Sequence, residues 1–177
     1  MLKFILTMVS CIVLNAQGHA EGDHMQNYTI VNKPSQMIVG IECKTSNKPD
    51  AGPIDIPKQW EKFFTEDIIN KIPNKSSNDI IALYCDYEGD FTKPYYFVIG
   101  CQTTSIDEIP EGMVAKVLPA SKYAVFKAAG DFPKSLIDTW GVIWQTQLNR
   151  TYTGDYEEYG EKFNKDPKEV DVFIAID

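Results

Sequence analysis

The sequence predicts an α+β domain built as a tandem, pseudo-twofold repeat of two β-α-β-β units. Three observations lead to this class. First, the same order of elements occurs twice: an extended segment broken at a proline, an amphipathic helix and two apolar strands. Second, each helix carries a tryptophan on its apolar stripe. Third, the length of 177 residues suits one domain. Because one unit cannot cover its own sheet, two should pack together. We expect one domain over residues 28–177, with units at about 28–104 and 113–177.

Residues 1–20, ahead of this domain, have the composition of a secretory signal. Lys3 precedes an apolar run from residue 4 to 14, and Ala20 supplies the small residue that signal peptidase requires. The run is shorter than the roughly 20 apolar residues that span a bilayer. We therefore expect cleavage, export to the periplasm or beyond, and a flexible segment at 21–27. A retained anchor and a lipid on Cys11 are the alternatives.

The first unit begins with residues 28–46, an extended segment broken at Pro34. Residues 54–72 should form a helix with Asp55 as its N-cap, because large apolar residues recur there at helical spacing: Trp60, Phe63, Phe64, Ile68 and Ile72. The runs "DIIALYCDY" and "YYFVIGCQT" are rich in β-branched and aromatic residues and predict two strands joined by a turn.

The second unit repeats this order with an extended segment at 114–130 broken at Pro119, a helix at 132–148, and strands at 155–163 and 169–176. The matched features are Pro34 with Pro119, Trp60 with Trp140, "YYFVIG" with "DVFIAI", and the phrase Asp86-Tyr87-Glu88 with Asp155-Tyr156-Glu157. We therefore expect the units to superpose with Trp60 on Trp140 and Tyr87 on Tyr156.

Composition argues against several classes of function. The chain has 17 basic and 25 acidic residues, and the basic residues do not cluster, so we expect no nucleic-acid partner and no membrane partner for the mature form. The only histidines, His19 and His24, precede the domain, which argues against a Ser-His hydrolase and a His-ligated zinc or haem. No cofactor, metal or catalytic motif is expected. Three cysteines match neither a disulfide framework nor a metal site and are expected to be small buried hydrophobes, their redox state left open: Cys43, Cys85 and Cys101.

Glu157 is the candidate centre of a binding site. If residues 155–161 form a strand, Glu157 shares a face with Asp155 and Tyr159. In the last strand we expect Val170, Val172, Ile174 and Ile176 to form the core face, which leaves Phe173 on the opposite face. Phe97, its expected repeat mate, shares a face with Tyr95.

A carboxylate beside these rings would make a concave site with one charged group. Burying an unpaired carboxylate costs several kcal/mol, or raises its pKa until it is neutral. A cationic ligand relieves that cost, and each aromatic face adds about 0.5–2 kcal/mol.

Each candidate also has a structural alternative. Glu157 could be a solvated strand residue, and Trp140 and Trp144 lie on the expected buried stripe of the second helix. Tyr84 and Tyr95 are evenly balanced between core and cleft. Glu88 runs directly into the turn "GDFTKP", so we expect Glu88, in the first copy of the acidic phrase, to be exposed to solvent.

The sequence resembles the gyrase-inhibitor-like small-molecule-binding domain, the effector-binding domain of AraC-type and MerR-type transcription activators. The resemblance covers nearly all of residues 28–177 and rests on "IPKQWEKFF", "YCDYEGDFTKPYYFVIGC", "DEIPEGMVAKVLPASKYAVFKAAG", "IDTWGVIW", "DYEEY" and "VDVFIAI". It implies two β-α-β-β units around a central ligand cleft. It also implies a buried glutamate among aromatic side chains that binds lipophilic cations, which by motif is Glu157. No helix-turn-helix pattern accompanies these motifs, and an export signal is unusual for the family.

Three functions follow as hypotheses. The first is a stand-alone binding protein for small, hydrophobic, cationic molecules, with ligand contacts from Glu157, Phe173, Phe97, Tyr95, Tyr84 and Trp140. The second is a hydrolase of reactive xenobiotics that uses Glu157 as general acid or base in the same cleft. The third is a protein-inhibitor module, which is favoured if side chains fill the cleft. The sequence identifies neither the ligand nor the oligomeric state.

Overall fold

The structure, a computed structural model, describes residues 28–177, so the expected signal and flexible segment lie outside the described residues. The first half contains β1 (Thr29–Lys33), β2 (Gln36–Thr45), α2 (Gly52–Thr65), α3 (Ile68–Lys71), β3 (Ile80–Cys85) and β4 (Tyr95–Thr103). The second half contains β5 (Val114–Leu118), β6 (Ser121–Gly130), α4 (Lys134–Gln145), β7 (Asp155–Tyr159), the 3-10 turn η1 (Glu161–Asn164) and β8 (Lys168–Ile176).

All these strands join one antiparallel eight-stranded sheet in the order β1-β6-β8-β7-β3-β4-β2-β5. The counterparts in the two halves are β1 and β5, β2 and β6, β3 and β7, and β4 and β8. When each strand is exchanged for its counterpart, the result is the same order read from the opposite edge of the sheet. This confirms the predicted α+β class and the pseudo-twofold repeat. The halves also interlock, because β1 pairs with β6 of the second half and β5 with β2 of the first.

The pseudo-twofold axis passes between β3 and β7. Their five residue pairs are centred on Ala82 opposite Glu157. Counterpart strands have the same length, apart from the sixth residue of β3, and aligning their first residues reproduces every register of the sheet. Under this alignment Ala82 corresponds to Glu157, and Tyr84 corresponds to Tyr159. At the axis itself, β7 therefore carries a glutamate where β3 carries an alanine.

Two of the predicted residue matches are wrong, although the repeat is present. The phrase Asp86-Tyr87-Glu88 follows the end of β3, whereas Asp155-Tyr156-Glu157 lies within β7, so Tyr87 does not correspond to Tyr156. Phe173 corresponds to Gly100 rather than to Phe97, whose mate is Val170. Because side chains alternate between faces, an alignment shifted by an odd number of residues moves a side chain to the opposite face of the sheet.

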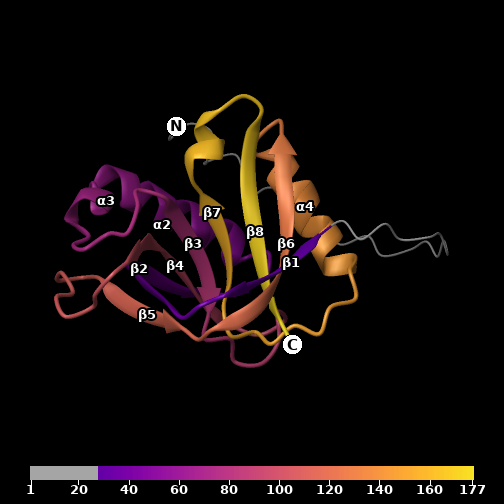
Figure 1. The fold of residues 1–177 in the computed structure, drawn as a ribbon, viewed down its shortest axis with the longest axis horizontal. Helices are drawn as coiled ribbons and strands as arrows, with labels where there is room; N and C mark the ends of the chain where they lie inside the picture. Colours follow the sequence, from indigo (N-terminus) through magenta and orange to yellow (C-terminus); the bar gives the residue numbers. More distant parts are fainter. Residues whose placement is uncertain (1–27) are drawn as a thin grey trace.

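Both long helices cover the same face of the sheet (Figure 1). Trp60 and Phe63 of α2 and Leu136 and Ile143 of α4 join one core with the strand residues beneath them. The first helix begins earlier than expected, because Ala51 rather than Asp55 occupies the N-cap position, and Asp55 instead accepts a hydrogen bond from Thr45 Oγ1.

The first helix also ends earlier than expected, at Thr65. Asp67 takes a left-handed backbone conformation with φ 51° and separates α2 from α3. Ile68 and Ile72 are nevertheless buried as predicted.

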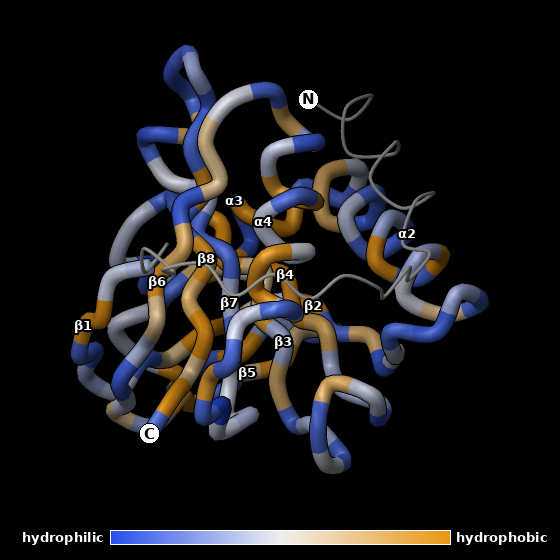
Figure 2. Tube along the Cα trace, turned by 90° about the vertical axis from the view of Figure 1, so that its right-hand side faces the viewer, coloured by the Kyte–Doolittle hydropathy of each residue, from blue (hydrophilic) through white to orange (hydrophobic). Residues whose placement is uncertain are grey.

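A second apolar cluster lies on the face of the sheet away from the helices and contains only strand residues, among them Tyr123, Tyr156 and Phe173. Figure 2 shows the hydrophobic colour concentrated along the inner strands and the hydrophilic colour at the turns. Within residues 28–177, no helix is long and apolar enough to cross a membrane.

Candidate functional site

A cavity of about 140 Å³ lies between α2 and α4, above β3, β4 and β7. A volume of this size takes one benzene-sized ring, so a larger molecule would extend through the opening of the cavity. The cavity reaches the surface at Phe91, whose side chain is partly exposed. Its wall contains seven aromatic residues: Trp60, Tyr84, Tyr87, Phe91, Tyr95, Trp140 and Trp144.

Glu157 lines this cavity and is only 3% exposed. Its Oε1 accepts hydrogen bonds from Tyr84 Oη at 2.9 Å and from Trp140 Nε1 at 2.7 Å. Its Oε2 accepts one from Tyr159 Oη at 2.6 Å. Three neutral donors therefore fix the position of the carboxylate in the wall.

Two features of the surroundings shift the pKa of Glu157 in opposite directions. Burial raises the pKa of its carboxyl above the ordinary value, and the hydrogen bonds from Tyr159, Trp140 and Tyr84 lower that pKa in part. Within residues 28–177, no Lys or Arg forms an ion pair with Glu157. The site thus contains a buried carboxylate that has hydrogen-bond donors but no protein countercharge.

Local sequence explains how the donors reach Glu157. Tyr159 is two residues further along β7, so both side chains lie on the same face. Tyr84 lies two residues beyond Ala82, the residue directly opposite Glu157. Tyr84 and Tyr159 are therefore pseudo-twofold mates, and each donates to a different oxygen of one carboxylate.

Aromatic rings surround the carboxylate at contact distance. The centroid of the Tyr84 ring lies 5.8 Å from Tyr95, 5.1 Å from Phe97 and 5.3 Å from Trp140. Trp140 in turn lies 6.1 Å from Trp144. Such aromatic faces attract cations. Because the wall has few polar groups, it restricts the shape of a ligand rather than requiring a fixed pattern of hydrogen bonds.

The structure brings four of the predicted site residues together at the cavity: Glu157, Tyr84, Tyr95 and Trp140. Phe97 is fully buried against Tyr84 and supports the wall from below. Phe173 is not beside Glu157. It lies on the opposite face, stacked on Tyr156 at 4.4 Å, because β8 pairs Val172 rather than Phe173 with Glu157.

Sequence reasoning missed several residues of the site. Tyr159, which donates to Glu157, had a signal, since its place on the same strand face as Glu157 followed from the alternation of side chains. Trp60 and Trp144 were assigned to the core by their helical spacing, which does not separate core from cavity wall. Phe91 and Arg150 lie outside the helices and strands, and their position depends on the tertiary fold.

Glu88 contrasts with Glu157 as expected. Its side chain is half exposed and pairs with Lys44 at 2.5 Å on the surface. The first acidic phrase still contributes to the site, but through another residue: Tyr87 lines the cavity and donates to Asp155 Oδ2 at 3.2 Å.

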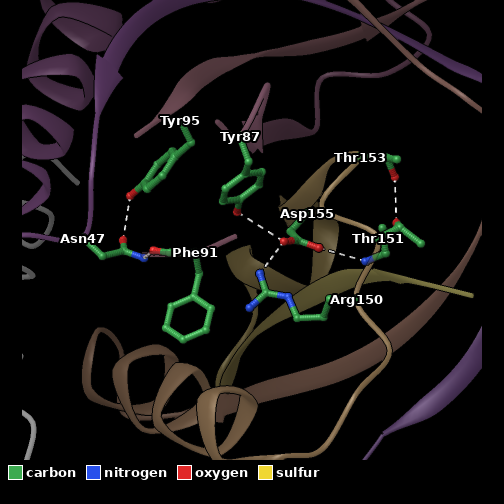
Figure 3. A network of polar contacts seen from close by, with 9 residues as sticks. Asn47, Tyr87, Phe91, Tyr95, Arg150, Thr151, Thr153 and Asp155 are labelled. Carbon is green, nitrogen blue, oxygen red and sulfur yellow. Dashed lines mark hydrogen bonds and ion pairs between the residues drawn. The ribbon is translucent and has the colours of Figure 1, made fainter. Parts of the chain in front are cut away.

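A second polar network lies beside the carboxylate (Figure 3). Arg150 Nη2 donates to the fully buried Asp155 at 2.5 Å. Asn47 links two parts of the wall, because it accepts from Tyr95 Oη at 2.9 Å and donates to the carbonyl oxygen of Phe91 at 2.9 Å.

The three cysteines are free thiols in the structure. Burial raises the pKa of Cys43 and Cys101 to about 11 and that of Cys85 to about 12, so they are protonated at neutral pH and are poor nucleophiles. Within the described part of the chain, no group of three or more His, Cys, Asp or Glu side chains is placed to hold a metal ion.

Comparison with known proteins agrees with this geometry. Residues 29–176 match the family described as Cass2, integron-associated effector binding protein. The Bacillus subtilis protein YobU, named as a candidate transcriptional regulator, is 31% identical over 145 residues, which cover 78% of this chain and 91% of YobU.

Two solved structures share the fold. A Vibrio cholerae integron cassette protein superposes with a TM-score of 0.67 at 27% identity, covering 86% of this chain and 97% of that one. SAV2435, solved bound to tetraphenylphosphonium, gives a TM-score of 0.69 at 18% identity, covering 85% and 93%. With the family match over nearly all of the described residues, the chain belongs to the integron-associated effector binding proteins.

Proposed function

We propose that this protein binds small, hydrophobic, cationic molecules in the cavity between α2 and α4. The observation that carries the proposal is Glu157, a buried carboxylate in an aromatic wall with no basic partner among the described residues. A ligand cation would supply the countercharge that the protein does not.

The three hydrogen bonds support this role rather than replace the ligand. Tyr84, Trp140 and Tyr159 contribute neutral donors, so they orient the carboxylate without neutralising its charge. The rings of Tyr84 and Trp140 also line the cavity, where a cation would meet aromatic faces and the field of the carboxylate together. We expect broad selectivity among hydrophobic cations, because few polar groups fix a ligand's orientation.

The tetraphenylphosphonium bound to SAV2435 gives a suitable first probe for this chain. The family's effector binding supports a small-molecule ligand in general. The open cavity also favours a small molecule over the protein-inhibitor alternative, for which a filled cleft was expected.

The hydrolase alternative is favoured by one observation, the raised pKa of the buried Glu157, which would help it to hold a proton for general acid catalysis. It requires the bound molecule to be consumed. Chromatography of ligand recovered after long incubation separates the two functions, since a binding protein returns the ligand unchanged.

Titration calorimetry with tetraphenylphosphonium and with neutral triphenylphosphine oxide tests the proposal. Glu157→Gln keeps the shape of the side chain and removes its charge. It should weaken the cation by about 1.5–3 kcal/mol, the scale of a charged contact in a partly dry site, and the neutral compound much less. Equal losses for the two compounds would remove the charge of Glu157 from the mechanism.

Glu88→Gln is the matched control, because the same substitution falls on a half-exposed side chain outside the cavity. It should leave both affinities unchanged. Stability gives a second readout. Since the pKa of Glu157 is raised in the folded state, its contribution to stability is greatest below the unfolded pKa and is lost as pH rises. Glu157→Gln should therefore be more stable than wild type near neutral pH, and this advantage should vanish in acid.

A further inference from the structure

Arg150 places a buried cation in the wall of the cavity that contains Glu157. Its side chain is 8% exposed, although it lies in the connection before β7. The guanidinium lies over two aromatic rings, 4.7 Å from the centroid of Tyr152 and 5.9 Å from that of Phe91. The cavity therefore has two polar groups of opposite charge.

The acidic partner of Arg150 already accepts three hydrogen bonds. Asp155 accepts from Arg150 Nη2, from Tyr87 Oη at 3.2 Å and from the backbone N–H of Ala175 at 2.8 Å. Figure 3 shows Arg150 and Tyr87 converging on the carboxylate. Asp155 neutralises the charge of Arg150, yet it engages only one of the five N–H groups that a guanidinium carries.

A second donor of Arg150 lacks an acceptor. Its Nε is buried and has no hydrogen-bond partner within residues 28–177. Asn47, the neutral amide in the same wall, has other partners: its oxygen accepts from Tyr95 and its nitrogen donates to Phe91. A buried donor without an acceptor is costly, and proteins rarely retain one unless another molecule supplies the acceptor.

A purely structural role explains only part of this arrangement. Arg150 forms a backbone bridge with Ile176, and its ion pair with Asp155 fixes the start of β7. The ion pair uses only Nη2 of the guanidinium, and neither contact satisfies Nε.

We propose that Arg150 forms a second subsite that binds an oxygen acceptor of the ligand, a carbonyl or a carboxylate. This rests on the proposed function, because the ligand's cationic part is taken to face Glu157. The preferred ligand is then dipolar: a hydrophobic cation with an oxygen acceptor held at a distance from the positive charge. A simple lipophilic cation would satisfy only half of the site.

A series of triphenylphosphonium ions tests the subsite. Alkyl, ω-carboxyalkyl and ω-methoxycarbonylalkyl derivatives share the cationic group and differ in the acceptor, and varying chain length accommodates the separation of the two subsites. Titration calorimetry on the wild-type protein should show about tenfold tighter binding for the best acceptor-bearing ion than for the alkyl ion of equal length, a typical gain for a hydrogen bond to a charged group. The ester and the acid distinguish a carbonyl from a carboxylate.

Arg150→Lys keeps a positive charge beside Asp155 and removes the planar group that carries Nε. The acceptor preference, measured as the ratio of the two affinities, should fall to about one. Arg150→Met with Asp155→Asn removes the ion pair as a unit and should abolish the same ratio if the lysine variant does not fold. Lys127→Met, which removes an exposed cation paired with Glu169, is the control and should leave the ratio unchanged.

The outcomes separate this proposal from the one it rests on. If no triphenylphosphonium ion binds the wild type, cation binding itself fails, and the subsite fails with it. If the alkyl ion binds but acceptors bring no gain, or if the gain persists in a folded Arg150 variant, cation binding stands and the acceptor subsite is overturned.

Discussion

Strands β3 and β7 lie side by side at the pseudo-twofold axis and differ at the position where the axis passes between them. Each carries a tyrosine directed at Glu157, Tyr84 in β3 and Tyr159 in β7, and the two tyrosines donate to different oxygens of its carboxylate. At the axis itself β7 carries Glu157 and β3 carries Ala82. The repeat thus supplies one tyrosine donor from each half, and the glutamate that β7 has in place of Ala82 supplies the negative charge.

This difference explains why one carboxylate suffices. Directly opposed residues of an antiparallel pair have Cβ atoms about 4.5–5.5 Å apart, so a second glutamate at position 82 would face Glu157 in the same buried space. Two such carboxylates would repel, and one would remain protonated. A small residue opposite Glu157 leaves one anion that both halves of the molecule hold.

The helices break the symmetry in a second way. Trp140 of α4 donates its indole N–H to Glu157, whereas Trp60 of α2 packs edge-on against Tyr159 at 5.2 Å and stacks on Phe64 at 5.8 Å. The predicted match of Trp60 with Trp140 therefore joins two residues that line one cavity but interact differently with the charge.

The largest effect is expected when the carboxylate is moved from β7 to the equivalent position of β3. Glu157→Ala should weaken an aromatic cation at least tenfold. Adding Ala82→Glu should recover about half of the lost binding free energy, because Tyr84 and Tyr159 would exchange roles around the new carboxylate. Recovery should be incomplete, since Trp60 does not replace the Trp140 donor. Calorimetry with tetraphenylphosphonium measures both steps.

Ala82→Glu alone is the control for this exchange. With Glu157 still present, it should lower the thermal midpoint, because two carboxylates would compete for one buried site. If the folded double variant binds no better than Glu157→Ala, the site depends on β7 alone and the axis has no functional meaning.

A smaller change compares the paired donors. Tyr84→Phe and Tyr159→Phe each remove one hydrogen bond that lowers the pKa of the Glu157 carboxyl, and should therefore raise that pKa further. A cation needs the ionised form, so affinity is lost as pH falls through that pKa. Each variant should therefore lose affinity for tetraphenylphosphonium at a higher pH than the wild type.

Calorimetry from acidic to neutral pH gives these profiles. Similar shifts would show that the two halves share the charge. A shift in Tyr159→Phe alone would assign control of the charge to β7, where Tyr159 donates at 2.6 Å against 2.9 Å for Tyr84.

The sequence predicted the fold better than the register. Proline breaks and apolar runs recur over tens of residues, so the repeat was visible without any exact alignment. The short phrase around Tyr87 and Tyr156 matched by chance, and nothing local distinguishes a chance match from a repeat. Because strand faces alternate, that uncertainty matters little for the fold but decides which side chains reach the cavity.

The candidate site was likewise predicted only in part. Glu157 was found from its strand context and the family resemblance, and Tyr84, Tyr95 and Trp140 do line the cavity with it. Arg150 and Phe91 were not found, because they enter the wall from connections whose path is set by tertiary packing. A charge pair such as Arg150 with Asp155 leaves no periodic signal.

The smallest expected effect on binding comes from Phe173, which the sequence placed in the cleft. It lies on the far face of the sheet, stacked on Tyr156 and beneath the Lys33 ammonium at 4.7 Å from its ring. Its counterpart in the first half is Gly100, where an added Cβ would lie 2.0 Å from the carbonyl oxygen of Val39, so only the second half has space for a ring. Phe173 thus fills the core of one half and does not reach the ligand.

Phe173→Leu should therefore lower the free energy of unfolding by about 1 kcal/mol, since the ring loses its stacking partner and part of its volume. The affinity for tetraphenylphosphonium should stay within about twofold, well below the effect of a charged contact. Chemical denaturation and calorimetry on the same preparation measure the two quantities. A large loss of affinity with intact stability would mean that the far face of β8 takes part in binding, and the assignment of the two faces would then have to be reversed.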